Sequence, residues 1–279
     1  QNSYGKSEVR LTKIVREGAL HRVFEITAAI QLEGAFEAAY TEGDNRSVIA
    51  TDTIKNTVYV VGKENDFKTI EQLATLLCRH FLKTYEHVSA VKEELSQANW
   101  QRIVVDGRPH DHAFTNGGTH RRICRAAMDR ANADPALQGG IHELRVLKST
   151  ASEWQNFHSD RYRTLKDTAE RILASKINAT WTYNTPAPDG DAAFEAVSEA
   201  MLRVFATTHS RGAQETLLGM GRAALEACPS IDSIHLELPN LHHIPFNLEP
   251  FGLKFENDIY VGTSDPYGLI TGTVSRGNL

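Results

Sequence analysis

The recurrence of apolar side chains at every second position over residues 24–32 limits the fold more than any other feature of the chain. A period of two sustained over nine residues is typical of a half-buried antiparallel strand. Val9 and Leu11 indicate a strand before it, and Glu17-Gly18 supplies a turn between the two. The apolar face consists of Phe24, Ile26, Ala28, Ile30 and Leu32.

The period then changes to that of a helix. Apolar residues recur at steps of three and four over 70–82, and Thr69 followed by Gln72 predicts a capping box at the start of this helix. We expect the helical signal to continue weakly to about Gln97. Two short strand signals precede the helix, and strand-like sequence returns after it. These strand signals lie at residues 47–50, 57–61 and 100–105.

The second half repeats the order of strands, helices and strands. Such segregated runs predict an α+β fold with helices on one face of an antiparallel sheet. We place the boundary in the segment 134–140, which divides the chain into residues 1–138 and 139–279. The expected strands are 141–148, 179–183, 234–238, 259–261 and 269–274, and the expected helices are 159–173, 194–205 and 217–225.

Composition excludes several classes of protein. Thirty Lys and Arg against 35 Asp and Glu give a net charge of −5, which disfavours general nucleic-acid binding. The three cysteines, Cys78, Cys124 and Cys228, form no C-x-x-C pair, so we expect neither a disulfide framework nor a zinc-thiolate site. We therefore expect the protein to function in a reducing compartment.

Targeting signals are equally scarce. No apolar stretch approaches the length of about 18 residues that a membrane span requires. Residues 1–10 lack the apolar core of a secretory signal, and the final tripeptide 277–279 is not a peroxisomal address. We therefore expect a cytoplasmic location.

Histidines supply the most metal-like motifs. His110 and His112 would share one face of an extended chain, and with Asp111 they could ligate zinc or iron. No third ligand from elsewhere is evident, so we favour a polar loop after the Asp106-Gly107 turn. His242 and His243 are adjacent, so at most one of them points into a given site. The chain contains no phosphate-binding loop, dinucleotide fingerprint or nucleophile elbow.

Eight segments, in order along almost the whole chain, resemble the urate oxidase (uricase) family. Any one of them would be weak, but eight in order are highly specific. They are Tyr4-Gly5-Lys6 with Val9-Arg10-Leu11, 50–57, 106–114, 147–150, 164–168, 179–181, 238–242 and 264–270.

This resemblance implies both a fold and an activity. Family members consist of two tandem T-fold (tunnelling fold) units, each a four-stranded antiparallel sheet with helices on one face. They form homotetramers with active sites at subunit interfaces. They oxidise urate with dioxygen to 5-hydroxyisourate and hydrogen peroxide, and they use no metal and no organic cofactor.

The resemblance also assigns catalytic residues. Lys6 matches the family's catalytic lysine, Thr51 its partner threonine, and His242 the histidine that completes a proton relay. The reaction removes a proton from an anionic purine, and a lysine can accept it only when neutral, so its pKa must be lowered. A near-neutral pKa suits the role of His242.

Substrate-binding residues follow from the same alignment. Arg171 matches an arginine that clamps one edge of urate with its planar fork, and Gln214 matches a glutamine that grips the opposite edge. The chain departs from the family at two positions. Trp154 stands where the family commonly has a phenylalanine stacked on the purine, so either Trp154 or Phe157 is the stacking residue. Gly212 stands where relatives often carry serine or valine. The full set of predicted substrate contacts is Thr51, Asp52, Trp154, Leu165, Arg171, Ala213, Gln214 and Asn240.

Two other functions stay open at this point. A different T-fold enzyme, such as a zinc-dependent hydrolase of a pterin or purine ring, would share the element order. A catalytically silent urate-binding protein would share the substrate contacts, although it would not need Lys6, Thr51 and His242 together.

Overall fold

The alternating segment forms the middle of β2 (Leu20–Gly34) in the computed structural model, which describes residues 2–278. Its five apolar side chains are all buried, and the polar side chains between them face the other way. The predicted Glu17-Gly18 turn joins β2 to β1 (Tyr4–Glu17), and the two strands pair antiparallel as expected. The first hairpin therefore follows directly from the sequence pattern.

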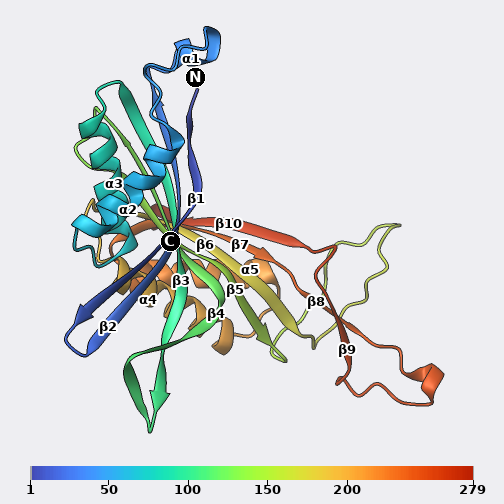
Figure 1. Cartoon of the computed structure of the whole chain (residues 1–279). Helices are drawn as coiled ribbons and strands as arrows, with labels where there is room; N and C mark the ends of the chain where they lie inside the picture. The colour runs from blue at the N-terminus through green and yellow to red at the C-terminus, as the bar shows by residue number, and fades with distance from the viewer. Residues whose placement is uncertain (1, 279) are drawn as a thin grey trace. The chain divides into compact units, whose positions relative to one another are not determined.

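The described chain contains five α-helices and ten β-strands, and it confirms the α+β prediction (Figure 1). The remaining strands are β3 (Val88–Val105), β4 (Arg108–Asp129), β5 (Ala136–Lys148), β6 (Leu173–Tyr183), β7 (Ile231–Pro239), β8 (His242–Pro245), β9 (Tyr260–Thr263) and β10 (Leu269–Ser275). The helices are α1 (Glu37–Thr41), α2 (Thr51–Glu64), α3 (Ile70–Thr84), α4 (Gly190–Thr207) and α5 (Ala213–Ala227), with short 3₁₀ turns at Glu249–Phe251 and Arg276–Asn278.

The chain forms two compact units, and each unit is built from two separate stretches of sequence. One unit is the chain up to Ile141 together with Thr180–Phe194, and the other is His142–Ala179 together with the chain from Glu195 onward. Neither unit is a continuous stretch of sequence. The single division into 1–138 and 139–279 stays a prediction about a repeat of element order. Leu279, within the tripeptide considered as an address, lies outside the described residues.

In the first unit the strands follow the order β1-β2-β3-β4, and all three pairs are antiparallel. Helix α2 packs against β1, and α3 packs against β3 and β4 (Figure 1). Helix α3 begins as predicted, because the Thr69 side chain accepts a hydrogen bond from the Gln72 backbone N–H at 3.3 Å. The Gln72 side chain accepts from the Lys68 backbone N–H at 2.7 Å, which is one residue earlier than a standard capping box requires.

Strands β5, β6, β7 and β10 are neighbours in that order, and β5 and β6 each have residues in both units. Helix α5 packs against β7 and β10. Strands β8 and β9 form a separate two-stranded sheet in which His242 pairs with Thr263. This small sheet follows β7 directly, so it carries the histidine pair away from the main sheet of the unit.

Four predicted elements were wrong. Residues 47–50 form a turn and irregular backbone before α2 rather than a strand. Residues 57–61 lie in α2, because Ile54, Val58 and Val61 are buried at helical spacing despite their β-branched side chains. The helix at residues 70–82 does not continue to Gln97, since β3 begins at Val88. Residues 159–172 form an irregular loop rather than a helix, with Leu173 opening β6.

The described part of the chain has no helix that is both long and apolar enough to cross a membrane. All three cysteines are free and buried in packed regions. They therefore serve as small apolar side chains in the cores of their units.

Candidate functional site

Lys6 owes its position to a close approach between β1 and β2. A Cβ atom on the preceding residue, Gly5, would lie only 1.7 Å from the Ile30 carbonyl oxygen, so only glycine fits there. The pairing then shifts between Lys6 and Val9, which marks a bulge in β1. Bulges re-aim side chains, and here the bulge follows Lys6 directly.

The start of α2 is tied to the same strand. The Tyr4 hydroxyl accepts a hydrogen bond from the Ile49 backbone N–H at 2.7 Å, just before the helix begins at Thr51. Thr51 and Asp52 therefore occupy the first turn of a helix whose entry is fixed by a residue two positions before Lys6. The structure thus brings these three predicted residues into one region of the first unit.

Electrostatics connects Lys6 with Asp52. The Lys55 ammonium donates to the Asp52 carboxylate at 2.5 Å and holds the pKa of that carboxyl below its usual range, and Lys6 lowers it further. Within residues 2–278 the Lys6 amine itself forms no hydrogen bond or ion pair. Lys6 is therefore near a carboxylate but free to meet another molecule.

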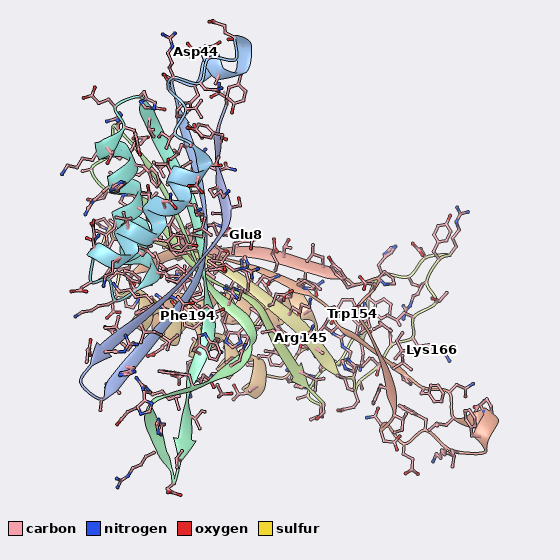
Figure 2. All side chains as sticks on the ribbon, in the orientation of Figure 1. Glu8, Asp44, Arg145, Trp154, Lys166 and Phe194 are labelled. Atoms are coloured by element: carbon pink, nitrogen blue, oxygen red, sulfur yellow. The ribbon has the colours of Figure 1, made fainter. Side chains whose placement is uncertain are left out.

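A second group of predicted residues lies in the second unit, on the loop between β5 and β6. Trp154 forms two backbone hydrogen bonds with Thr168, at 2.8 and 2.9 Å, and the Arg171 N–H donates to the Ser152 carbonyl at 2.9 Å. These bonds fold the irregular segment back on itself. Figure 2 shows Trp154 at the base of this loop and Lys166 farther along it. Trp154 and Arg171 consequently lie together.

Arg171 is held at one end only. Its Nε donates to the hydroxyl of the fully buried Ser152 at 3.3 Å, and its guanidinium carbon lies 5.6 Å from the centre of the Trp154 ring. Burial lowers the pKa of Arg171 from its ordinary value, but a guanidinium stays charged. Both terminal amino groups remain free of partners among residues 2–278. They can therefore donate hydrogen bonds to two acceptors on one edge of a planar ligand.

The first peptide of α5 offers an oriented donor. The Gly212 carbonyl accepts hydrogen bonds from the Ser210 hydroxyl at 3.2 Å and from the Thr216 hydroxyl and backbone N–H at 3.3 Å. A trans peptide points its N–H opposite to its carbonyl, so the Ala213 N–H is directed away from this cluster. The free N–H groups of a helix start also favour an anion.

Asn240 and His242 follow the end of β7. The Asn240 N–H donates to the Gly268 carbonyl at 2.8 Å, and Asn240 bridges to Ser175 on β6. Asn240 and Ala213 both line one narrow, apolar cavity of the second unit. His242, half-buried, opens β8 two residues later. The end of β7 thus brings Asn240 to the cavity that the start of α5 also lines.

Two predicted contacts have a less direct outcome. Leu165 is 62% exposed on the irregular loop. Trp154 and Phe157 stack on each other, with ring centres 5.4 Å apart and planes inclined by 15°. Phe157 therefore covers one face of the indole, and the choice between the two as the purine's stacking partner stays a prediction.

Sequence reasoning missed the residues that support the site. Ser152, Ser210 and Thr216 are buried polar side chains. Ser152 accepts from Arg171, a predicted substrate contact, and the other two donate to the carbonyl of Gly212, which precedes Ala213. Serines and threonines in a loop carry no distinguishing pattern. Only the position of Ser152, two residues before Trp154, could have drawn attention to it.

The histidine motif lies in a strand rather than the loop that we favoured. His110 and His112 belong to β4, their rings are 4.6 Å apart, and His21 approaches His112 at 5.6 Å between ring centres. In the range 2–278 no group of three potential ligands is arranged to hold a metal ion.

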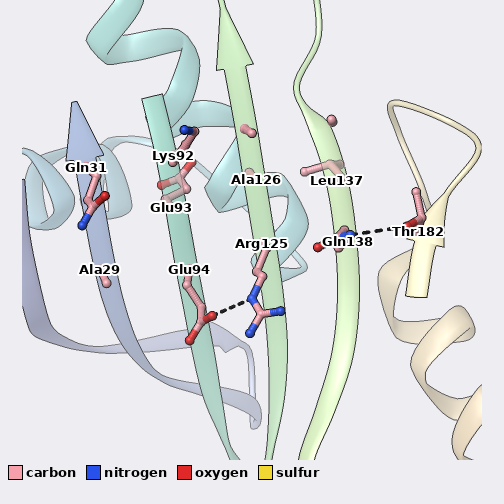
Figure 3. Close-up of a pocket in the computed structure, with 12 residues that line it drawn as sticks. Ala29, Gln31, Lys92, Glu93, Glu94, Arg125, Ala126, Leu137, Gln138 and Thr182 are labelled. Carbon is pink, nitrogen blue, oxygen red and sulfur yellow. Dashed lines mark hydrogen bonds and ion pairs between the residues drawn. The ribbon is translucent and has the colours of Figure 1, made fainter. Parts of the chain in front are cut away.

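A larger hollow lies over the strands of the first unit, and it contains none of the predicted residues (Figure 3). Both of its cations are already paired: the Arg125 guanidinium meets Glu94 at 2.6 Å, and the Lys92 ammonium meets Glu33 at 2.6 Å. Alanine side chains form much of the rest of the lining. Because both cations are paired with carboxylates, this hollow is a weaker candidate for an anionic substrate than the region around Arg171.

The chain is similar to known proteins over nearly its whole length. A family model described as Uricase matches residues 2–127 and 137–271. A protein named uricase from Arthrobacter globiformis is 42% identical over 276 residues, which are 99% of this chain and 89% of that protein. A uricase from Dictyostelium discoideum is 35% identical over 279 residues, 99% of this chain and 96% of that protein. The crystal structure of the Arthrobacter globiformis uricase has a TM-score of 0.92, covering 99% of this chain and 94% of that one.

Proposed function

This chain belongs to the uricase family, and we propose that it oxidises urate with dioxygen and water to 5-hydroxyisourate and hydrogen peroxide. Urate loses two electrons and gains a hydroxyl group from water, while dioxygen gains two electrons and two protons. The observation that carries the proposal is the guanidinium of Arg171, held through Nε beside an aromatic plane with its two terminal amino groups free.

Substrate binding depends on local rather than overall charge. The chain carries a net charge of −5, so it does not attract an anion as a whole. Arg171 supplies the positive charge, Gln214 a donor and an acceptor, and the Ala213 N–H a further donor at the start of α5. We assign Asn240 to hold dioxygen or water beside the ring.

Proton transfer falls to the residues of the first unit and to His242. In the neutral form the Lys6 amine accepts a proton through the Thr51 hydroxyl, and His242 completes the relay. The Lys6 amine is committed to no hydrogen bond or ion pair among residues 2–278, which leaves it available to the Thr51 hydroxyl. We propose that none of these steps requires a metal or an organic cofactor.

We further propose a homotetramer in which each active site takes Lys6 and Thr51 from one subunit and Arg171 and Gln214 from another. The distribution of these residues over two compact units supports this division. Three free, buried thiols support a reducing compartment such as the cytoplasm.

The test is an assay on protein freed of metals by chelation. We expect loss of the ultraviolet absorbance of urate with one peroxide released per urate, in protein without stoichiometric zinc. Lys6→Met and Thr51→Ala should each lower kcat by at least about a hundredfold, as expected for loss of a general base, while urate still binds. Lys83→Met, on the exposed last turn of α3, is the matched control. Binding without peroxide release by the unaltered protein would identify a silent binding protein instead.

A subunit-mixing experiment tests the shared site. Lys6→Met and Arg171→Ala should each be inactive alone, but co-expressed chains should regain part of the activity, because mixed pairs of subunits contain one intact site. Absence of any recovery in purified mixed oligomers would contradict a site shared between subunits.

A further inference from the structure

The edge of the Trp154 indole meets the backbone at the start of α5 within the second unit. Gly212 is the N-cap residue of α5, and its φ of −178° is extended backbone that any residue adopts. A Cβ atom at this position would nevertheless lie 3.0 Å from Cζ3 and 3.5 Å from Cε3 of the indole. The absence of a side chain at Gly212, rather than its backbone freedom, therefore makes room for the ring.

Trp154 cannot easily give way. Its backbone is fixed by both hydrogen bonds to Thr168, and Phe157 stacks on its ring with planes 15° apart. Arg171 approaches the ring as well. A side chain at Gly212 would thus push the indole against neighbours that are themselves held.

The same added atom would also disturb Gln214. It would lie 3.3 Å from the Gln214 side-chain oxygen, which is closer than an ordinary van der Waals contact. One position on the chain therefore touches both the aromatic ring and the carboxamide.

We propose that Gly212 is a specificity-determining residue matched to Trp154: it sets the position of the indole and of the Gln214 carboxamide, between which the planar substrate anion binds. The inference rests on the proposed function of this site. Gly212 has no side chain, so its part in substrate binding would not be apparent from the polar contacts of the site.

Helix capping makes an opposite prediction. Serine is a better N-cap residue than glycine, so Gly212→Ser should stabilise α5 slightly if capping were all that mattered. If the steric match governs, Gly212→Ser should impair urate binding where Trp154 is present and not where a smaller ring replaces it. A phenyl ring has no carbon atoms at the Cζ3 edge that faces Gly212.

The experiment is a double-mutant cycle of Gly212→Ser and Trp154→Phe, with KM and kcat for urate and the thermal unfolding midpoint measured for all four proteins. We expect Gly212→Ser to raise KM at least about fivefold in the presence of Trp154, as overpacking does, with a smaller change in kcat. Trp154→Phe alone should raise KM modestly, and adding Gly212→Ser to it should change KM less than about twofold. Gly277→Ser, in the exposed 3₁₀ turn Arg276–Asn278 where an added Cβ would meet nothing within 4 Å, is the control.

Equal effects of Gly212→Ser in both backgrounds, or an unchanged KM in the presence of Trp154, would overturn the inference. If Gly212→Ser fails to fold, recovery of folding in the double variant supports the match, and failure of both overturns it. Absence of urate turnover in the unaltered protein would instead refute the proposed function. The unfolding midpoints of the same four proteins would then still decide the steric match.

Discussion

Replacing Ser152 with alanine isolates the support of Arg171 from its charge. The substitution removes the oxygen that accepts from Arg171 Nε at 3.3 Å and leaves the backbone bond between the two residues in place. The methyl group of alanine occupies the site of the Ser152 Cβ, so the packing around this fully buried residue changes little. The guanidinium would then be free to turn away from the Trp154 ring.

The size of the effect follows from the geometry. A hydrogen bond to a charged group contributes about 1.5–3 kcal/mol, and a length of 3.3 Å places this one at the lower end. About 1.4 kcal/mol corresponds to a tenfold change, so we expect KM for urate to rise roughly tenfold. The change in kcat should stay below roughly threefold, since Ser152 does not touch the reacting atoms.

The assay is steady-state urate oxidation followed by ultraviolet absorbance, together with thermal unfolding. Ser198→Ala is the matched control, because the Ser198 hydroxyl is buried without a hydrogen-bond partner in residues 2–278. Arg171→Ala sets the upper limit of the loss. A Ser152→Ala protein with the KM of the unaltered chain would show that Ser152 does not hold the clamp, and a fall in kcat alone would place Ser152 in the chemistry instead.

Two further predictions concern stability and alignment. Burial raises the pKa of Glu93 to about 8, and a hydrogen bond from Cys78 offsets part of that rise. This carboxyl therefore stabilises the fold fully below about pH 4.5 and loses that contribution as pH rises towards 8. Glu93→Gln should flatten the dependence of the unfolding free energy on pH in this window, and an unchanged slope would refute the assignment. Gly5→Ala places a Cβ 1.7 Å from the Ile30 oxygen, so β1 must shift at a cost of roughly 3 kcal/mol or more; we expect a lower unfolding midpoint and a lower kcat, and native values of both would contradict the close approach.

Local patterns predicted the regular elements well where the sequence carried one clear period. The strand at 24–32 and the Thr69 cap of α3 are confirmed, because alternation and capping depend on neighbours within a few residues. The expected helix at 159–173 is absent. Its apolar spacing suggested an amphipathic face, but the segment forms long-range hydrogen bonds to Ser152 and Trp154 instead of a helical ladder.

In the candidate site, too, the sequence predicted some features and only the tertiary structure revealed others. The family resemblance assigned roles to Lys6, Arg171 and Gln214 without any structure, and these roles stay predictions. Nothing in the sequence indicated that Trp154 and Phe157 would stack on each other. That contact depends on the path of an irregular loop, for which no periodic pattern exists.

The sequence by itself determined the α+β class, the first hairpin, the caps, the uricase resemblance and the residues proposed to bind and react. The tertiary structure decided that the units exchange segments, that Ser152 holds Arg171, and that Gly212 makes room for Trp154. The physical reason is separation along the chain. Periodicity and capping act over a few residues, whereas Gly212 and Trp154 meet only because the backbone hydrogen bonds of the loop and of α5 bring distant segments within contact distance.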